Sequence, residues 1–274
     1  MPDWSRRPPS KRSRAAALVL GLLVPTVSAA AADDPLARAR VLYNQRQYVA
    51  AVSAAEEARL VPSRVDSADL IAARAYLERY RESAASDDLT NARERLRRLD
   101  PQRLGPRERV EFIVGLGEAL YLDNSYGAAA AVFDSVLARS DGLAPDARDT
   151  VLDWWATALD RDTRPRSDLE RQSLYRRIRD RMEAELAANG ASGTAYYWLT
   201  AAARAQGDLQ AAWEAAQAAW VRAPLVIDHG EALRADLDRL MLVGVVPDRA
   251  KAIGQPPDTL RAEWEKFKER WKRE

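Results

Sequence analysis

Apolar residues recur three and four positions apart along most of the chain from Asp33 onward. This spacing places them on one face of an α-helix, because the helix has 3.6 residues per turn. No stretch shows the sustained alternation of polar and apolar residues that is typical of a β-strand. Pro and Gly residues interrupt the pattern at regular intervals and mark turns. The sequence therefore predicts an all-α protein with helices of roughly 12 to 20 residues joined by short turns.

Internal repetition is visible in three segments of the chain. Aromatic, apolar and small residues fall at matching positions in residues 42–62, 116–137 and 196–224. The equivalent positions Tyr48, Tyr126 and Leu209 lie 78 and 83 residues apart. If one further unit fills each gap, the repeat is about 39 to 42 residues long, within the range of helical-repeat proteins. We expect residues 67–101 and 146–189 to be these units, each with two helices around a turn.

The three segments resemble the tetratricopeptide repeat (TPR) family. The last segment carries Leu199 early in its first helix, Gly207 in the turn and the small residue Ala212 on its second helix. The first segment departs from the family pattern, because Arg46 stands where a turn Gly is usual. The resemblance implies a right-handed α-solenoid of TPR-like helical hairpins over residues 32–226. An antiparallel helical bundle rich in Ala is the alternative.

The C-terminal part, residues 227–274, is predicted to hold one more helical hairpin over residues 229–253 and then an amphipathic helix. Apolar residues of that last helix are spaced four, three and four apart and form one stripe: Leu260, Trp264, Phe267 and Trp271. This apolar stripe must be buried against another surface. Either the helix folds back as a C-terminal capping helix of the solenoid, or it binds a partner or a second copy.

Residues 1–31 are predicted to be an export signal peptide. Basic residues precede an apolar run of only 13 residues, Ala15–Val27, whereas a membrane-spanning helix needs about 20. Small residues follow and allow cleavage after Ala29 or Ala31. Sec export is favoured over the twin-arginine route, although Arg6-Arg7 resembles the latter's signal. We expect a periplasmic or secreted protein with no stable membrane insertion after cleavage.

The amino-acid composition argues against several classes of binding site and of catalysis. The 42 basic and 41 acidic residues give a net charge of +1, so the chain has no overall excess of charge with which to hold nucleic acid. Cys is absent and His229 is the single His, which argues against thiolate chemistry and against metal sites built on His pairs. Glu82-Ser83 resembles the catalytic pair of soluble lytic transglycosylases, but the surrounding motifs of those enzymes are missing. We expect a non-catalytic protein without a cofactor or metal.

Candidate binding residues follow from the TPR resemblance. In that family the first helix of each repeat faces a concave groove, and aromatic side chains are favoured anchors at interfaces. The positions that would face a peptide or protein partner are Arg40, Tyr43, Asn44, Glu118, Tyr121, Tyr197 and Arg204. Trp198 follows Tyr197 directly, and such neighbouring rings cannot all face one core, so Trp198 either joins this groove or packs between two repeats. The Lys and Asn residues with which some TPR proteins clamp a peptide carboxylate are absent from the equivalent places.

These observations predict an exported TPR-like scaffold or adaptor that mediates protein–protein interactions in the cell envelope. The alternative is an accessory subunit of an envelope enzyme that acts on peptidoglycan or polysaccharide, in which the aromatic residues would stack on sugar rings. The partner's identity and the oligomeric state stay open at this point.

Overall fold

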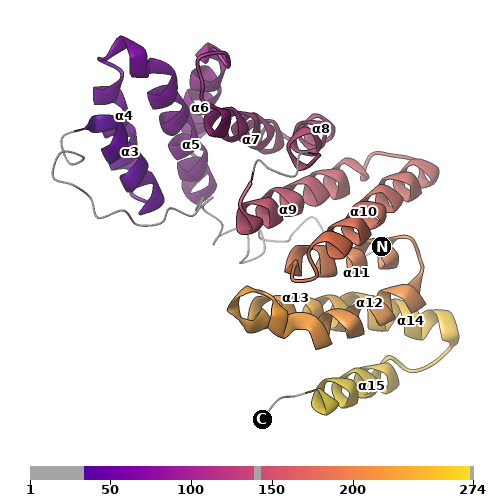
Figure 1. Cartoon of the computed structure of the whole chain (residues 1–274). Helices are drawn as coiled ribbons and strands as arrows, with labels where there is room; N and C mark the ends of the chain where they lie inside the picture. Colours follow the sequence, from indigo (N-terminus) through magenta and orange to yellow (C-terminus); the bar gives the residue numbers. More distant parts are fainter. Residues whose placement is uncertain (1–33, 139–142, 272–274) are drawn as a thin grey trace. The chain divides into compact units, whose positions relative to one another are not determined.

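The computed structural model describes residues 34–138 and 143–271, and all regular elements within these ranges are helices. The predicted all-α class, with helices packed as hairpins, is confirmed. The chain forms two compact units, Met1–Ala158 and Leu159–Glu274, and the boundary lies inside helix α9 (Pro145–Asp162). Figure 1 shows the helices coloured along the sequence.

Unit 1 is a succession of helical hairpins. Its helices before α9 are α3 (Pro35–Asn44), α4 (Tyr48–Ala58), α5 (Val65–Ser83), α6 (Ser86–Arg98), α7 (Pro106–Leu122) and α8 (Tyr126–Leu137), with a 3-10 turn at Pro62–Arg64. Each odd-numbered helix packs against the helix that follows it, and α5 also contacts α3 and α7 (Figure 1). The first helices of successive hairpins thus lie next to one another in the order α3, α5, α7.

The three aligned segments share one turn geometry. The residues at Arg46, Asn124 and Gly207 all have a positive φ, at 61°, 61° and 79°. In each turn the amide of that residue donates to the carbonyl three residues earlier, and the next amide donates to the carbonyl five residues earlier. The spacings predicted from the sequence therefore mark equivalent turns, and an Arg adopts the left-handed conformation where the family usually has Gly.

Close approach of the two helices in a hairpin depends on small residues. Gly117 of α7 lies so near Phe133 of α8 that an added Cβ would stand 2.5 Å from the Phe133 ring. Phe133 is fully buried and contacts Trp154 of α9, with ring centroids 5.8 Å apart. The Phe133 ring thus occupies the space beside Gly117, which has no side chain. Through its contact with Trp154, the same ring links α8 to the next helix.

Unit 2 contains the remaining helices. They are α10 (Asp168–Ala188), α11 (Gly193–Ala205), α12 (Leu209–Arg222), α13 (Glu231–Leu240), α14 (Val246–Ile253) and α15 (Pro257–Arg270), with 3-10 turns at Ala223–Leu225 and Ile227–Gly230. Helix α11 packs against α10, α12 and α13, and α12 also contacts α14 (Figure 1).

The two units expected between the aligned segments are present as helix pairs. Residues 67–101 and 146–189 each hold two helices around a turn, as predicted.

The predicted hairpin over residues 229–253 is wrong. A π-helical segment, Met241–Val245, joins α13 directly to α14, and the backbone stays right-handed helical through the junction. Pro247 explains the π segment, because its ring has no N–H and would clash with the carbonyl four residues earlier in a regular α-helix. The chain reverses only after Ile253, so α15 pairs with this long helix.

Helix α15 folds back onto unit 2. Leu260, Trp264 and Phe267 are buried, whereas Trp271 is 50% exposed. Trp264 is fully buried between two tryptophans of α12, with ring centroids 6.1 Å from Trp213 and 5.5 Å from Trp220. The indole nitrogen of Trp264 also donates a 2.8 Å hydrogen bond to Asp238 of α13. These three stripe residues therefore cap the chain's own helices.

The predicted export signal, residues 1–31, lies outside the described residues. None of the described helices is both long enough and apolar enough to cross a membrane.

Candidate partner-binding surface

The predicted groove residues of unit 1 are largely committed to contacts within the unit. Tyr43 and Glu118 are buried, at 5% and 6% exposure. Arg40 is paired with Glu108, whose pKa is lowered: burial raises it, but hydrogen bonds from Ser67, the Gly105 amide and Arg40 outweigh burial. Asn44 and Tyr121 are half-buried. Only part of this face is open to a partner.

The predicted groove residues of unit 2 show the same commitment. Trp198 is buried, and Tyr197 beside it is half-buried, with its ring centroid 5.6 Å from that of Trp198. Arg204 donates to the Asp248 carboxylate at 2.8 Å. Its guanidinium rests on Gly244, where an added Cβ would come within 2.7 Å. Arg204 thus ties α11 to the π segment and α14.

A row of ion pairs lies between α5 and α7. Arg74 and Arg81 of α5 face Glu111 and Glu118 of α7, and both pairs are 2.8 Å long. Because each helix contributes residues seven apart, two turns separate the two pairs. Glu78 stands between the arginines on α5 and also contacts Arg81, at 3.3 Å. The side chains of all five are at most 19% exposed.

Aromatic rings complete the surroundings of the two arginines. The guanidinium of Arg74 lies 4.5 Å from the ring centroid of Tyr43, and that of Arg81 lies 4.3 Å from the ring of Trp154. Burial raises the pKa of Glu118 to about 7; Arg81 lowers it and Glu78 raises it further. Burial likewise raises the pKa of the Tyr43 hydroxyl. The face formed by α3, α5 and α7 is therefore filled by its own charged groups.

Sequence reasoning missed this row of ion pairs. The spacing of Arg74, Glu78 and Arg81 is four and three, which places them on one helix face. A charged stripe of this kind usually faces water, and its partners on α7 are about forty residues away in the sequence. The signal that would have helped is the pair Glu111 and Glu118, seven apart and the only charged residues between Val110 and Leu122 in a helix.

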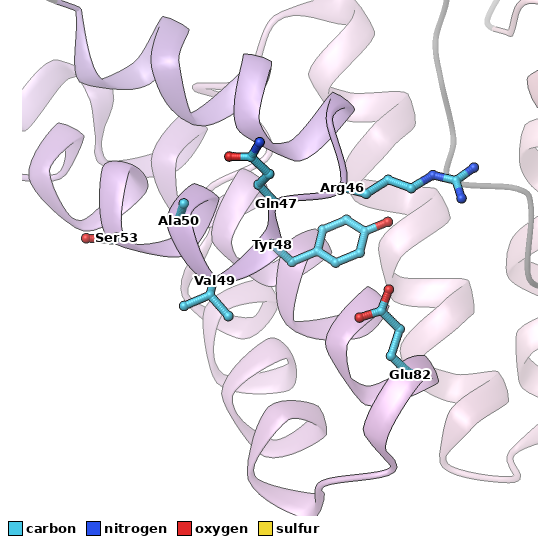
Figure 2. Close-up of a pocket in the computed structure, with 7 residues that line it drawn as sticks. All are labelled: Arg46, Gln47, Tyr48, Val49, Ala50, Ser53 and Glu82. Carbon is cyan, nitrogen blue, oxygen red and sulfur yellow. The ribbon is translucent and has the colours of Figure 1, made fainter.

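An open pocket of about 420 Å³ lies where α4 begins and α5 ends. Most of its lining comes from the α3–α4 turn and the first turns of α4, and one residue comes from α5: Arg46, Gln47, Tyr48, Val49, Ala50, Ser53 and Glu82. Figure 2 shows the Tyr48 ring reaching toward Glu82, with its hydroxyl on the side of Arg46. Val49 is 70% exposed, and Tyr48 is 5% exposed.

The pocket combines an apolar centre with charged walls. Burial raises the pKa of Tyr48 to about 12, and Glu78 and Glu82 raise it as well. Glu82 is exposed and makes no salt bridge with any residue in the described ranges. Gln47 provides no side-chain cap for α4, so the first amides of this helix have neither a capping side chain nor an intrahelical acceptor. We call this surface, comprising the seven lining residues, the α4 surface.

Two stretches of the chain, residues 93–109 and 161–181, are rich in Arg, and these arginines form ion pairs with Asp and Glu side chains near them. Arg93 pairs with Asp123 at 3.1 Å, and Arg166 pairs with Asp162 at 2.7 Å. Among the residues that the structure describes, no group of three or more His, Asp or Glu side chains is placed to hold a metal ion.

No family model, curated protein or solved structure matches this chain. The resemblance to TPR proteins therefore rests on the sequence motifs alone.

Proposed function

We propose that the chain is an exported adaptor, built as a right-handed solenoid of TPR-like hairpins, that binds another protein of the cell envelope without catalysing a reaction. The proposal differs from the sequence-based one in its site. The observation that carries it is the α4 surface, where the exposed Val49 and the carboxylate of Glu82 line one pocket. The more central groove positions Tyr43, Glu118 and Trp198 are buried.

The chemistry of the α4 surface defines the partner. Interfaces between proteins place apolar contacts at the centre and polar contacts at the rim. Val49 and Ala50 offer such a centre, and Glu82 offers an acceptor for a cation at the rim. The free amides at the start of α4 can donate to a backbone carbonyl of the partner. We therefore propose a partner segment that carries an apolar side chain next to a Lys or Arg.

The test is a comparison of two matched variants of residues 32–274 in crosslinked envelope extracts. Val49→Asp places a charge at the centre of the α4 surface. Leu169→Asp makes the same change at a residue that is 82% exposed on α10, far from this pocket in the chain. Both side chains are exposed, so neither change is expected to alter the far-UV circular dichroism. Loss of a central interface residue typically costs about 2 kcal/mol or more, which is more than tenfold in affinity.

The expected result is a protein retained by the wild type and by Leu169→Asp but at least tenfold depleted with Val49→Asp. Equal retention by all three chains contradicts the assignment of the site. Retention of polysaccharide in place of protein contradicts the adaptor function and favours the accessory-subunit alternative.

A further inference from the structure

We propose that unit 1 contains a proton-dependent contact between α5 and α7, in which a proton shared by Glu118 and its neighbours holds the two helices together at mildly acidic pH and is lost at alkaline pH. The proposal does not depend on the α4 surface. It rests on the geometry of the row of ion pairs, where three carboxylates are enclosed with two guanidinium groups.

The charges in this enclosure do not balance around Glu118. Arg74 is engaged by Glu111, which also has the half-exposed Arg107 at 3.3 Å. Glu118 and Glu78 are left to share Arg81, at 2.8 and 3.3 Å. The five largely buried side chains of the row, two arginines and three glutamates, together carry a net charge of −1. Such a site favours a proton on one of the carboxylates, because an uncompensated buried charge is costly.

Other titratable groups also surround Glu118. Those with the largest effects on Glu118 or on its partner Arg81 are Tyr43 of α3, Arg74 and Glu78 of α5, and Tyr121 of α7. Toward α6 and α8 the neighbours of Gly115 and Gly117 are apolar, namely Leu96 and Phe133, and the ion pair of Arg93 with Asp123 lies at the C-terminal end of α7. Tyr126 of α8 packs edge-on against Tyr121, and Trp154 of α9 stacks on Arg81.

The direction of the pH effect follows from linkage. The pKa of Glu118 is raised to about 7 in the folded chain, above its ordinary value of 4.5. The folded state therefore binds the proton more tightly than the unfolded state. This stabilisation is fully present below pH 4.5 and is lost as the pH rises through about 7. Since each pKa unit corresponds to a tenfold change, the opening equilibrium of the α5–α7 contact should rise about tenfold between pH 6 and pH 8.

The experiment is amide hydrogen exchange of the full chain, measured by mass spectrometry between pH 5.5 and 8.5 and corrected for the intrinsic pH dependence of exchange. For the wild type we expect protection of the α5 and α7 peptides to fall about tenfold from pH 6 to pH 8. Glu118→Gln keeps the shape of the side chain and removes its titration, so its profile should be flat. A flat wild-type profile, or an unchanged slope in Glu118→Gln, overturns the proposal.

Two further variants separate this effect from a merely structural one. Glu111→Gln alters a buried carboxylate on the same helix face that already has two arginine partners, and it should leave the slope in place. If Glu111→Gln abolishes the slope, the assignment to Glu118 is overturned. Glu78→Gln removes the carboxylate that competes for Arg81, and it should move the midpoint of the pH profile to lower pH. A midpoint that is unchanged or higher contradicts the shared-proton arrangement.

Discussion

The α5–α7 interface of unit 1 and the interface of α15 with α12 and α13 in unit 2 join helices by different kinds of contact. Between α5 and α7, ion pairs run along facing stripes, as at Arg74–Glu111 and Arg81–Glu118. Beneath α15, tryptophans meet, and Trp264 is completely enclosed by Trp213 and Trp220. Charged side chains still take part in unit 2, because Lys268 of α15 pairs with Asp238 at 2.7 Å.

The two interfaces should respond differently to substitution and to pH. Burial of large rings supplies stabilisation that is nearly independent of pH and of salt. Buried ion pairs contribute little net stabilisation compared with apolar contacts, but loss of one partner leaves a charge without compensation. We therefore expect the α15 interface to be sensitive to the size of its side chains and the α5–α7 interface to be sensitive to their protonation. Four substitutions test these interfaces and the packing around them.

The largest effect is expected for Trp264→Ala. Removal of a fully buried Trp leaves a cavity between Trp213 and Trp220, and substitutions of this kind cost about 3–5 kcal/mol. Chemical denaturation measures the loss, and hydrogen exchange should show that α15 loses protection first. Trp271→Ala is the matched control, because that ring is 50% exposed; a loss equal to that of Trp264→Ala would contradict the enclosed position of Trp264.

Arg81→Met should cost about 3 kcal/mol at pH 8, because it leaves Glu78 and Glu118 buried without their shared cation. The loss should be smaller at pH 5.5, where a proton neutralises one carboxylate. Denaturation curves at the two pH values give the comparison. Adding Glu118→Gln to Arg81→Met should restore part of the stability at pH 8, and no recovery would show that Arg81 acts by packing on Trp154 alone.

Gly117→Ala should destabilise the α7–α8 hairpin by about 1–3 kcal/mol, because the new methyl group meets the buried Phe133 ring. The control is Gly115→Ala on the same helix, where the nearest atom to an added Cβ is 3.4 Å away. There the gain in helix propensity, about 1 kcal/mol, should offset the closer contact. Thermal denaturation of the two variants should rank Gly117→Ala well below Gly115→Ala, and equal melting temperatures would contradict the close approach.

The smallest effect is expected for Gly207→Ala in the α11–α12 turn. Nothing lies within 4 Å of an added Cβ, so the cost comes from the positive φ alone and should be about 1 kcal/mol. Urea denaturation is sensitive enough to measure it. The equivalent Asn124→Gly in unit 1 should cost less than Gly207→Ala, because Gly tolerates the positive φ and only an exposed hydrogen bond from the Tyr126 hydroxyl is lost; a larger loss than that of Gly207→Ala would argue against a common turn.

Much of the helical architecture could be predicted from the sequence, because it depends on local patterns. The turns at Arg46, Asn124 and Gly207 follow from the spacing of the residues around them, and the stripe of α15 follows from its apolar period. The prediction of a hairpin over residues 229–253 is wrong because a helix can continue past a proline through a π segment when tertiary packing holds it together. Periodicity shows which residues share a face and leaves open what covers that face.

The candidate site was harder to predict for the same reason. Glu118 and Tyr43 stand at groove positions in the TPR alignment, yet α5 brings Arg74 and Arg81 onto that face and closes it. Those contacts join residues about forty positions apart, which one sequence does not reveal. The α4 surface is equally non-local, since Glu82 of α5 completes a pocket whose other walls come from residues 46–53.

We propose that a protein partner binds the α4 surface and not the face of α3, α5 and α7, most of which is occupied by its own ion pairs. Site-specific photocrosslinking tests it most directly, with a photoreactive side chain placed at Val49 in one chain, at Tyr121 in a second and at Leu169 in a third. The account predicts a light-dependent protein adduct from position 49 and none from position 169 or position 121. An adduct that forms from position 121 but not from position 49 would contradict it.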